Sequence, residues 1–138
     1  MAEVVRFPFK VVQRLFGRGS LMPIVPITLS LGNQILETEG LLDTGASVNV
    51  LPYQSGLALG ADWDSLDSQV QLTGSLARHE ARILMTYARI GAFDPVELAF
   101  AWTRAEKAPL LLGQTNFFMA FDVFFSRTDK YFELSLRQ

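Results

Sequence analysis

A single carboxylate stands in one of the most apolar parts of this 138-residue chain, within GLLDTGASVNVLP at residues 40–52. Leu41 and Leu42 precede Asp43, and Val48, Val50 and Leu51 follow it. A carboxylate at the edge of a core is destabilising unless it is paired, hydrogen-bonded or protonated. Asp43 therefore either caps a turn, as Asp does in many loops, or belongs to a site that compensates its charge.

The composition excludes several kinds of site. The chain has no cysteine and one histidine, His79, so disulfides, thiol nucleophiles, Cys-ligated zinc and multi-histidine metal sites cannot be built from one chain. A serine triad would have to use His79, which its charged neighbours Arg78 and Glu80 make a better candidate for a solvated residue. If the chain is an enzyme, carboxylates are its leading acid and base.

Length and charge narrow the remaining classes. A chain of 138 residues that is 49% hydrophobic predicts one domain with a real core. The net charge of -2 gives no indication of a nucleic-acid partner. No apolar run approaches the roughly 20 residues of a membrane span, and the N-terminus lacks the clean apolar segment of a secretory signal. We expect a cytoplasmic protein without membrane contact.

The N-terminal segment allows two interpretations. Arg6, Lys10, Arg14 and Arg18 recur every four residues, which in a helix would give a basic amphipathic face for an anionic surface. Pro8 and the many β-branched and aromatic residues favour an extended arm, which is the preferred interpretation. We expect an arm or strand over 1–20, followed by one domain over 21–138.

Alternation of apolar and polar residues predicts an all-β chain. A hairpin is expected over 70–91, with its turn near 73–77 and its return strand over 81–90. Helical turns are expected within 53–67, where Asp62, Asp64 and Asp67 lack the Gly and terminal Glu of a calcium loop. The other expected strands are 22–32, 35–43, 48–52, 96–102 and 110–112, followed by a short helix around 115–121 and a closing hairpin of 122–127 and 131–136. The phenylalanines at 117, 118, 121, 124 and 125 are interpreted as core or interface packing.

Two separated motifs resemble those of one protein family. Leu41-Leu42-Asp43-Thr44-Gly45-Ala46 is similar to the Asp-Thr/Ser-Gly motif of the single-domain, clan AA retropepsin-like aspartic proteases, and Leu111-Leu112-Gly113 to their later apolar-apolar-Gly motif. The resemblance covers about residues 20–136, and the long C-terminal part is most similar to bacterial and cellular members. It implies an all-β acid-protease barrel with one short helix near the C-terminus.

The resemblance also implies a mechanism. One chain carries one such Asp, so Asp43 of two copies would meet at a two-fold axis and share a proton. In aspartic proteases generally, such a pair loses its two protons in widely separated steps. The pair would activate water to hydrolyse a peptide bond, without a cofactor or metal. The expected protein is a homodimeric endopeptidase acting on an extended peptide or protein.

Further residues receive roles from the same resemblance. Thr44 would lock the two Asp loops together, Gly45 would leave room for the substrate backbone, and Ala46 would support the loop. Thr73, Gly74 and Ser75 would form the tip of a flap that closes over the peptide. Leu111, Leu112 and Gly113 would form the ψ-loop beside the catalytic loop.

The sequence departs from the family pattern at three points. Gln114 follows Gly113 where an Arg is common, and Ser47 stands where retroviral members have the Asp that pairs with that Arg. A neutral contact could replace that ion pair. The flap contains a single glycine, Gly74. These departures support an alternative function, a dimeric retropepsin-fold binding or scaffold module with little or no protease activity.

Overall fold

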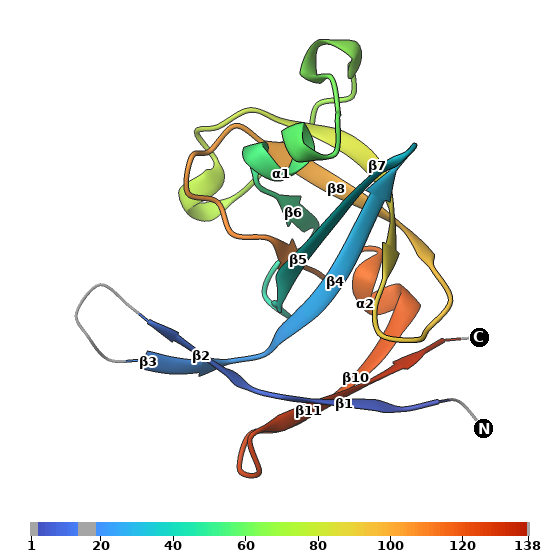
Figure 1. Cartoon of the computed structure of the whole chain (residues 1–138). Coiled ribbons are helices and arrows are strands. Elements are labelled where there is room, and N and C mark those ends of the chain that lie inside the picture. The colour runs from blue at the N-terminus through green and yellow to red at the C-terminus, as the bar shows by residue number, and fades with distance from the viewer. Residues whose placement is uncertain (1–2, 14–18, 138) are drawn as a thin grey trace.

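Six strands close into a barrel at the centre of the molecule (Figure 1). The structure, a computed structural model, describes residues 3–13 and 19–137. Around the barrel the strands follow the order β4-β5-β9-β6-β8-β7, and β4 pairs with β7 to close it. Their bounds are β4 Ile24–Leu31, β5 Gln34–Leu42, β6 Asn49–Leu51, β7 Ala81–Arg89, β8 Val96–Thr103 and β9 Leu111–Leu112. The all-β prediction and most of the expected strands are confirmed.

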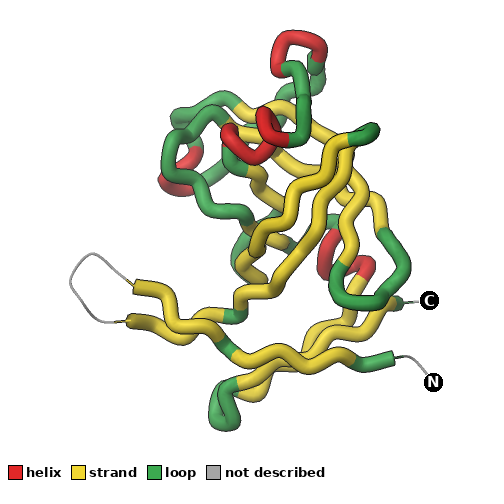
Figure 2. Tube along the Cα trace, viewed as in Figure 1, coloured by secondary structure: helices red, strands yellow, loops and turns green. Residues whose placement is uncertain are grey.

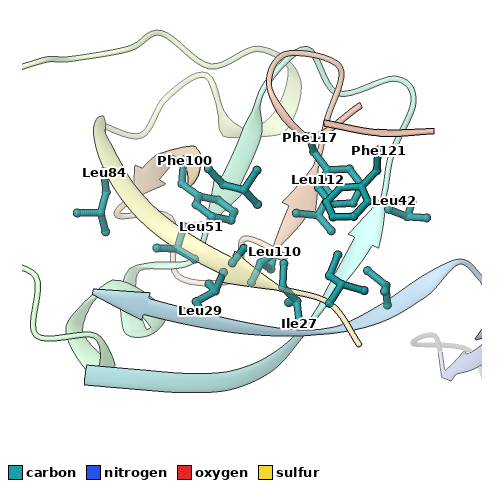
Figure 3. Packing of buried hydrophobic residues seen from close by; sticks show 14 of the residues in the cluster. Ile27, Leu29, Leu42, Leu51, Leu84, Phe100, Leu110, Leu112, Phe117 and Phe121 are labelled. Atoms are coloured by element: carbon teal, nitrogen blue, oxygen red, sulfur yellow. The ribbon is translucent and has the colours of Figure 1, made fainter. Parts of the chain in front are cut away.

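The interior of the barrel is apolar because its long strands turn one row of side chains inward. On β7 the side chains of Leu84, Thr86 and Ala88 are buried, and the residues between them are exposed. Buried side chains of β4, β5, β8 and β9 meet Phe117 and Phe121, which come from the C-terminal part of the chain (Figure 3). Two phenylalanines of the expected cluster therefore belong to the core.

A second, three-stranded sheet lies below the barrel and joins the two ends of the chain (Figures 1 and 2). Its order is β1-β11-β10, with β1 Val5–Pro8, β10 Phe121–Ser126 and β11 Tyr131–Leu136. A separate pair is formed by β2 Lys10–Gln13 and β3 Gly19–Met22. The extended interpretation of the N-terminal segment thus holds for 5–13, whereas Arg14 and Arg18 lie outside the described residues.

Helices are few and short. The helix expected near the C-terminus is α2, Phe117–Ala120. The helical turns expected after β6 are α1, Tyr53–Ala58, and a 3-10 turn, Trp63–Ser65. Asp62 caps that turn by accepting a hydrogen bond from the backbone N–H of Asp64, as expected for a solvated helix start. No helix in the described ranges is long and apolar enough to cross a membrane.

The prediction of a hairpin over 70–91 is wrong for its first arm. The return strand, β7, forms as expected, but the preceding residues contribute only an isolated bridge between Gln69 and Arg82. Residues 74–76 form a 3-10 turn with Gly74 at φ +66°. The Gln71 side chain donates hydrogen bonds to the carbonyls of Leu72 and Ala77, so the segment folds on itself and no ladder extends along it. β7 pairs instead with β8 along most of its length and with β4 at its C-terminal end.

Candidate functional site

Asp43 is positioned by two short parallel strand ends. Leu41 and Leu42 end β5 and pair in parallel with Leu111 and Leu112 of β9. The backbone N–H of Asp43 donates to the carbonyl of Leu112 at 3.0 Å, which continues the ladder by one bond. Leu42 and Leu112 are buried, so the apolar residues before each loop fix where that loop begins.

The loop over residues 43–47, called the Asp43 loop below, turns around the carboxylate itself. The N–H of Gly45 donates to Oδ1 of Asp43 at 2.9 Å, and the N–H of Ala46 donates to its carbonyl at 3.1 Å. Asp43 therefore does cap a turn, as the simpler interpretation expected. Its side chain is nevertheless half-buried, at the floor of a cleft, where a carboxylate can also act chemically.

A second loop, residues 113–116, packs directly against the Asp43 loop and is called the Gly113 loop. The N–H of Gln114 donates to the carbonyl of Ala46, and that of Thr115 to the carbonyl of Ser47, both at 2.9 Å. A Cβ on Gly113 would lie 2.6 Å from the carbonyl oxygen of Val48 and 2.7 Å from that of Ala46. Only glycine allows this approach without moving backbone.

Asn49 holds these parts together, and sequence reasoning missed it. Its side chain is 0% exposed. Its Oδ1 accepts from the N–H of Gly113 at 2.8 Å, while its Nδ2 donates to the carbonyl of Ala99 and to Oδ1 of Asn116. The available signal was a lone amide in an apolar strand, since a buried polar side chain needs hydrogen-bond partners.

A neutral contact occupies the place of the ion pair that the sequence lacks. Nε2 of Gln114 donates to the backbone carbonyl of Thr44 at 2.7 Å, linking the Gly113 loop to the Asp43 loop. Ser47 is exposed, and its backbone carbonyl accepts the hydrogen bond from the N–H of Thr115. The neutral contact of Gln114 is thus made with Thr44, and that a neutral contact replaces the Arg–Asp pair stays a prediction.

A cleft of about 230 Å³ brings the predicted site residues together. Its floor contains Asp43, Gly45 and Ala46, with Leu111 beside them. Its other wall is the segment 71–76, called the lid loop below, which contains Thr73, Gly74 and Ser75. These three residues are exposed, whereas Leu72 of the same segment is buried, so the lid loop is anchored in the core at Leu72 and its exposed tip borders the cleft.

The remaining candidates lie outside the cleft. Thr44 is exposed beside Asp43 and does not line the cleft. His79 is exposed and lines a separate surface groove with Arg104 and Lys107. Within residues 3–13 and 19–137, no group of three or more His, Cys, Asp or Glu side chains is placed to hold a metal ion. The polar groups that the cleft residues offer are the Asp43 carboxylate, hydroxyl and amide side chains, and backbone groups.

A comparison with solved structures decides the fold. Over 99% of this chain and 94% of the other, the structure superposes with a TM-score of 0.66 on the crystal structure of a retropepsin-like aspartic protease from Rickettsia conorii, at 16% sequence identity. This chain has the retropepsin-like fold. No known family model matches the sequence, and no curated protein matches it either. The retropepsin-like fold thus rests on shape and on the two loops, not on overall sequence similarity.

Proposed function

We propose that the protein is an aspartic endopeptidase that works as a homodimer and hydrolyses extended polypeptides. The observation that carries this proposal is the Asp43 carboxylate at the floor of a cleft, capped by the Gly45 N–H and facing the lid loop. A retropepsin-like fold with this loop is suited to bringing two copies of Asp43 together at a two-fold axis. The protease of the same fold in Rickettsia conorii gives further support.

Two adjacent carboxylates would share one proton, because both cannot ionise readily at short distance. The ionised one would take a proton from a water molecule whose oxygen attacks the peptide carbonyl carbon. The protonated one would give its proton to the carbonyl oxygen. Collapse of the resulting diol would break the C–N bond, with a proton transferred to the leaving nitrogen. Gly45 would leave space for the substrate backbone, and the lid loop would limit water.

Several exposed features are consistent with a partner copy. Thr44 is exposed next to Asp43, where it could contact the same loop of a second chain. The sheet β1-β11-β10 has two open edges, and Phe124 of β10 is 55% exposed. Open strand edges pair readily with another chain. The proposal also includes a cytoplasmic location and a chain organised as an N-terminal arm over 1–20 and one domain over 21–138.

One observation favours a second candidate, a dimeric binding module of the same fold with little activity. The lid loop is a 3-10 turn held by Gln71, not a long hairpin. A short lid would hold a peptide and exclude water less completely, which would lower catalysis more than binding. The intact Asp43 loop argues for the protease, because a binding module gains nothing from a pair of central carboxylates.

A random peptide library incubated with the protein between about pH 4 and 7 tests the proposal. We expect cleavage by the native protein and none by Asp43→Asn, whose side chain has nearly the same shape but cannot accept a proton. Equal cleavage by both proteins would reject the mechanism. Peptide binding by both proteins without cleavage at any pH would establish the binding module.

A further inference from the structure

An apolar side pocket opens next to the cleft, and the two share Val48. The pocket has a volume of about 150 Å³. Its lining includes Val70, Ile83, Ala99 and Ala101, with Thr115 and Asn116 of the Gly113 loop. A cavity of about 150 Å³ with apolar walls is large enough for a benzene-sized group. The side pocket therefore fits one branched aliphatic or phenyl side chain.

The pocket continues onto the outer surface of the barrel. Ile83, Met85 and Tyr87 alternate on the outward face of β7 and are 39%, 44% and 56% exposed. Ile83 lies opposite Ala101 and Met85 opposite Ala99, so the two pocket alanines of β8 share this face. We call the three β7 side chains the β7 stripe.

The far end of the β7 stripe reaches another depression. Tyr87 and Ile35 line a groove of about 270 Å³ together with Thr28, Ser30 and Arg89. Ile83 and Tyr87 are four positions apart along the strand, a span of about 13 Å at the usual rise of ~3.3 Å per residue. Every second side chain of an extended peptide lies on one face, with the same spacing as neighbouring members of the β7 stripe. Such a peptide could therefore place one side chain beside each member of the stripe.

We propose that the side pocket and the β7 stripe form an accessory site that binds an extended, apolar segment of the polypeptide substrate, outside the part that lies over Asp43. This inference rests on the proposed function. The cleft and the side pocket share Val48, and this continuity identifies the occupant. A substrate polypeptide that leaves the cleft at Val48 enters the side pocket, and none of the residues that line this pocket is charged. Exposed apolar side chains that gather on one sheet face are typical of a binding surface. Glu97 lies opposite Tyr87 and bounds the apolar face at that end.

The accessory site predicts a preference for long substrates. A short peptide fills only the cleft, whereas a longer one also gains the apolar contacts of the stripe. Substitutions on the stripe should therefore raise KM for long substrates and leave short peptides unaffected. This selectivity separates the accessory site from the catalytic residues, whose loss would affect substrates of every length.

Binding is measured first in the Asp43→Asn background, so that it does not depend on catalysis. The probes are two fluorescein-labelled peptides of about twelve residues, long enough to span the cleft and the stripe. One alternates Leu and Thr and the other alternates Ser and Thr. We expect the Leu peptide to bind more tightly than the Ser peptide. The double substitution Met85→Thr and Tyr87→Thr, called the stripe variant below, should weaken binding of the Leu peptide by about tenfold, because two apolar contacts are lost.

Val11→Thr is the matched control, because Val11 is also an exposed strand residue, 57% accessible, on β2. Threonine suits strands, so these exposed substitutions should leave the fold intact, which circular dichroism would verify. Equal binding of the Leu peptide to the stripe variant and to Val11→Thr would overturn the accessory site. Dissociation of a dimer by the stripe variant would also overturn it, by showing that a second copy covers this face.

The same variants in the active protein distinguish this inference from the proposed function. Cleavage of all substrates with no effect of the stripe variant would reject the accessory site and leave the protease standing. Selective loss of Leu-peptide binding in a protein that cleaves nothing would reject the protease and leave a binding site. We expect β-casein, an unfolded protein, to be cleaved several-fold less efficiently by the stripe variant, with octapeptide cleavage unchanged.

Discussion

Replacing Asn49 with leucine removes the buried amide that joins the two loops of the cleft. Leucine has a similar volume, so the change removes hydrogen bonds without opening a large cavity. The N–H of Gly113 would lose its acceptor inside the protein, which costs about 1–3 kcal/mol. The two bonds from Nδ2 to Ala99 and Asn116 contribute about 0.5–1.5 kcal/mol each. The sum is about 2–6 kcal/mol of lost unfolding free energy, with a midpoint of roughly 4 kcal/mol.

Urea denaturation measures this loss. With a slope of about 2 kcal/mol per molar urea, a loss of roughly 4 kcal/mol lowers the midpoint by about 2 M. A midpoint within about 0.3 M of the native value would refute the role given to Asn49.

Asn49→Asp tests the same buried hydrogen bonds through the pH dependence of the unfolding free energy. A buried carboxyl at this position would have a folded-state pKa above its ordinary value of about 3.9. When protonated it can accept from Gly113 and donate one hydrogen bond, to Asn116 or to the Ala99 carbonyl, so it keeps all but one of the bonds that the amide makes. Stability gained by a group with a raised pKa is present below the unfolded pKa and is lost as the pH rises through the folded pKa. The variant should thus be close to native at about pH 4 and weakest at about pH 7, after subtraction of the native curve. Equal destabilisation at both values would contradict this reasoning.

Substitutions at three further positions test the packing of the core and the contacts between the loops. Gly113→Ala would push a methyl group into backbone carbonyls, so we expect a loss of about 3 kcal/mol or more and no cleavage; a native-like urea midpoint would contradict this. Gly56→Ala would drive its Cβ into the indole ring of Trp102, so thermal unfolding should show destabilisation of at least ~1–3 kcal/mol with altered tryptophan fluorescence. Gln114→Ala should lower the unfolding free energy by about 1 kcal/mol, because the hydrogen bond to the Thr44 carbonyl is lost. Gln114→Arg should keep a donor at this place, so equal stabilities of the two variants would show that the contact is unimportant.

Much of the barrel could be predicted because most of its long strands alternate. β4, β5 and β7 each have one buried and one more exposed row, which the period of two reveals. The closing hairpin of β10 and β11 was equally visible, since polar residues separate two apolar runs. The Asp43 loop could be located from the sequence because few arrangements tolerate a carboxylate between buried strands.

The parts that could not be predicted depend on contacts between distant residues. Nothing local to Gln71 indicates that its side chain binds the carbonyls of its own loop and ends the expected ladder. The buried network of Asn49 spans three segments that only the folded barrel brings together. The pairing of β1 with β11 joins the two ends of the chain, and periodicity carries no information about such partners.

The most direct test of the shared active site mixes native protein with the Asp43→Asn variant at a fixed amount of native chain. In a homodimer with one carboxylate from each copy, an equal amount of variant converts half of the native chains into mixed dimers, so activity falls to about half once the chains have exchanged. A larger excess should lower it further. Activity that stays unchanged at every ratio, with exchange verified by labelled chains, would show that each chain hydrolyses peptides on its own and would contradict the shared site.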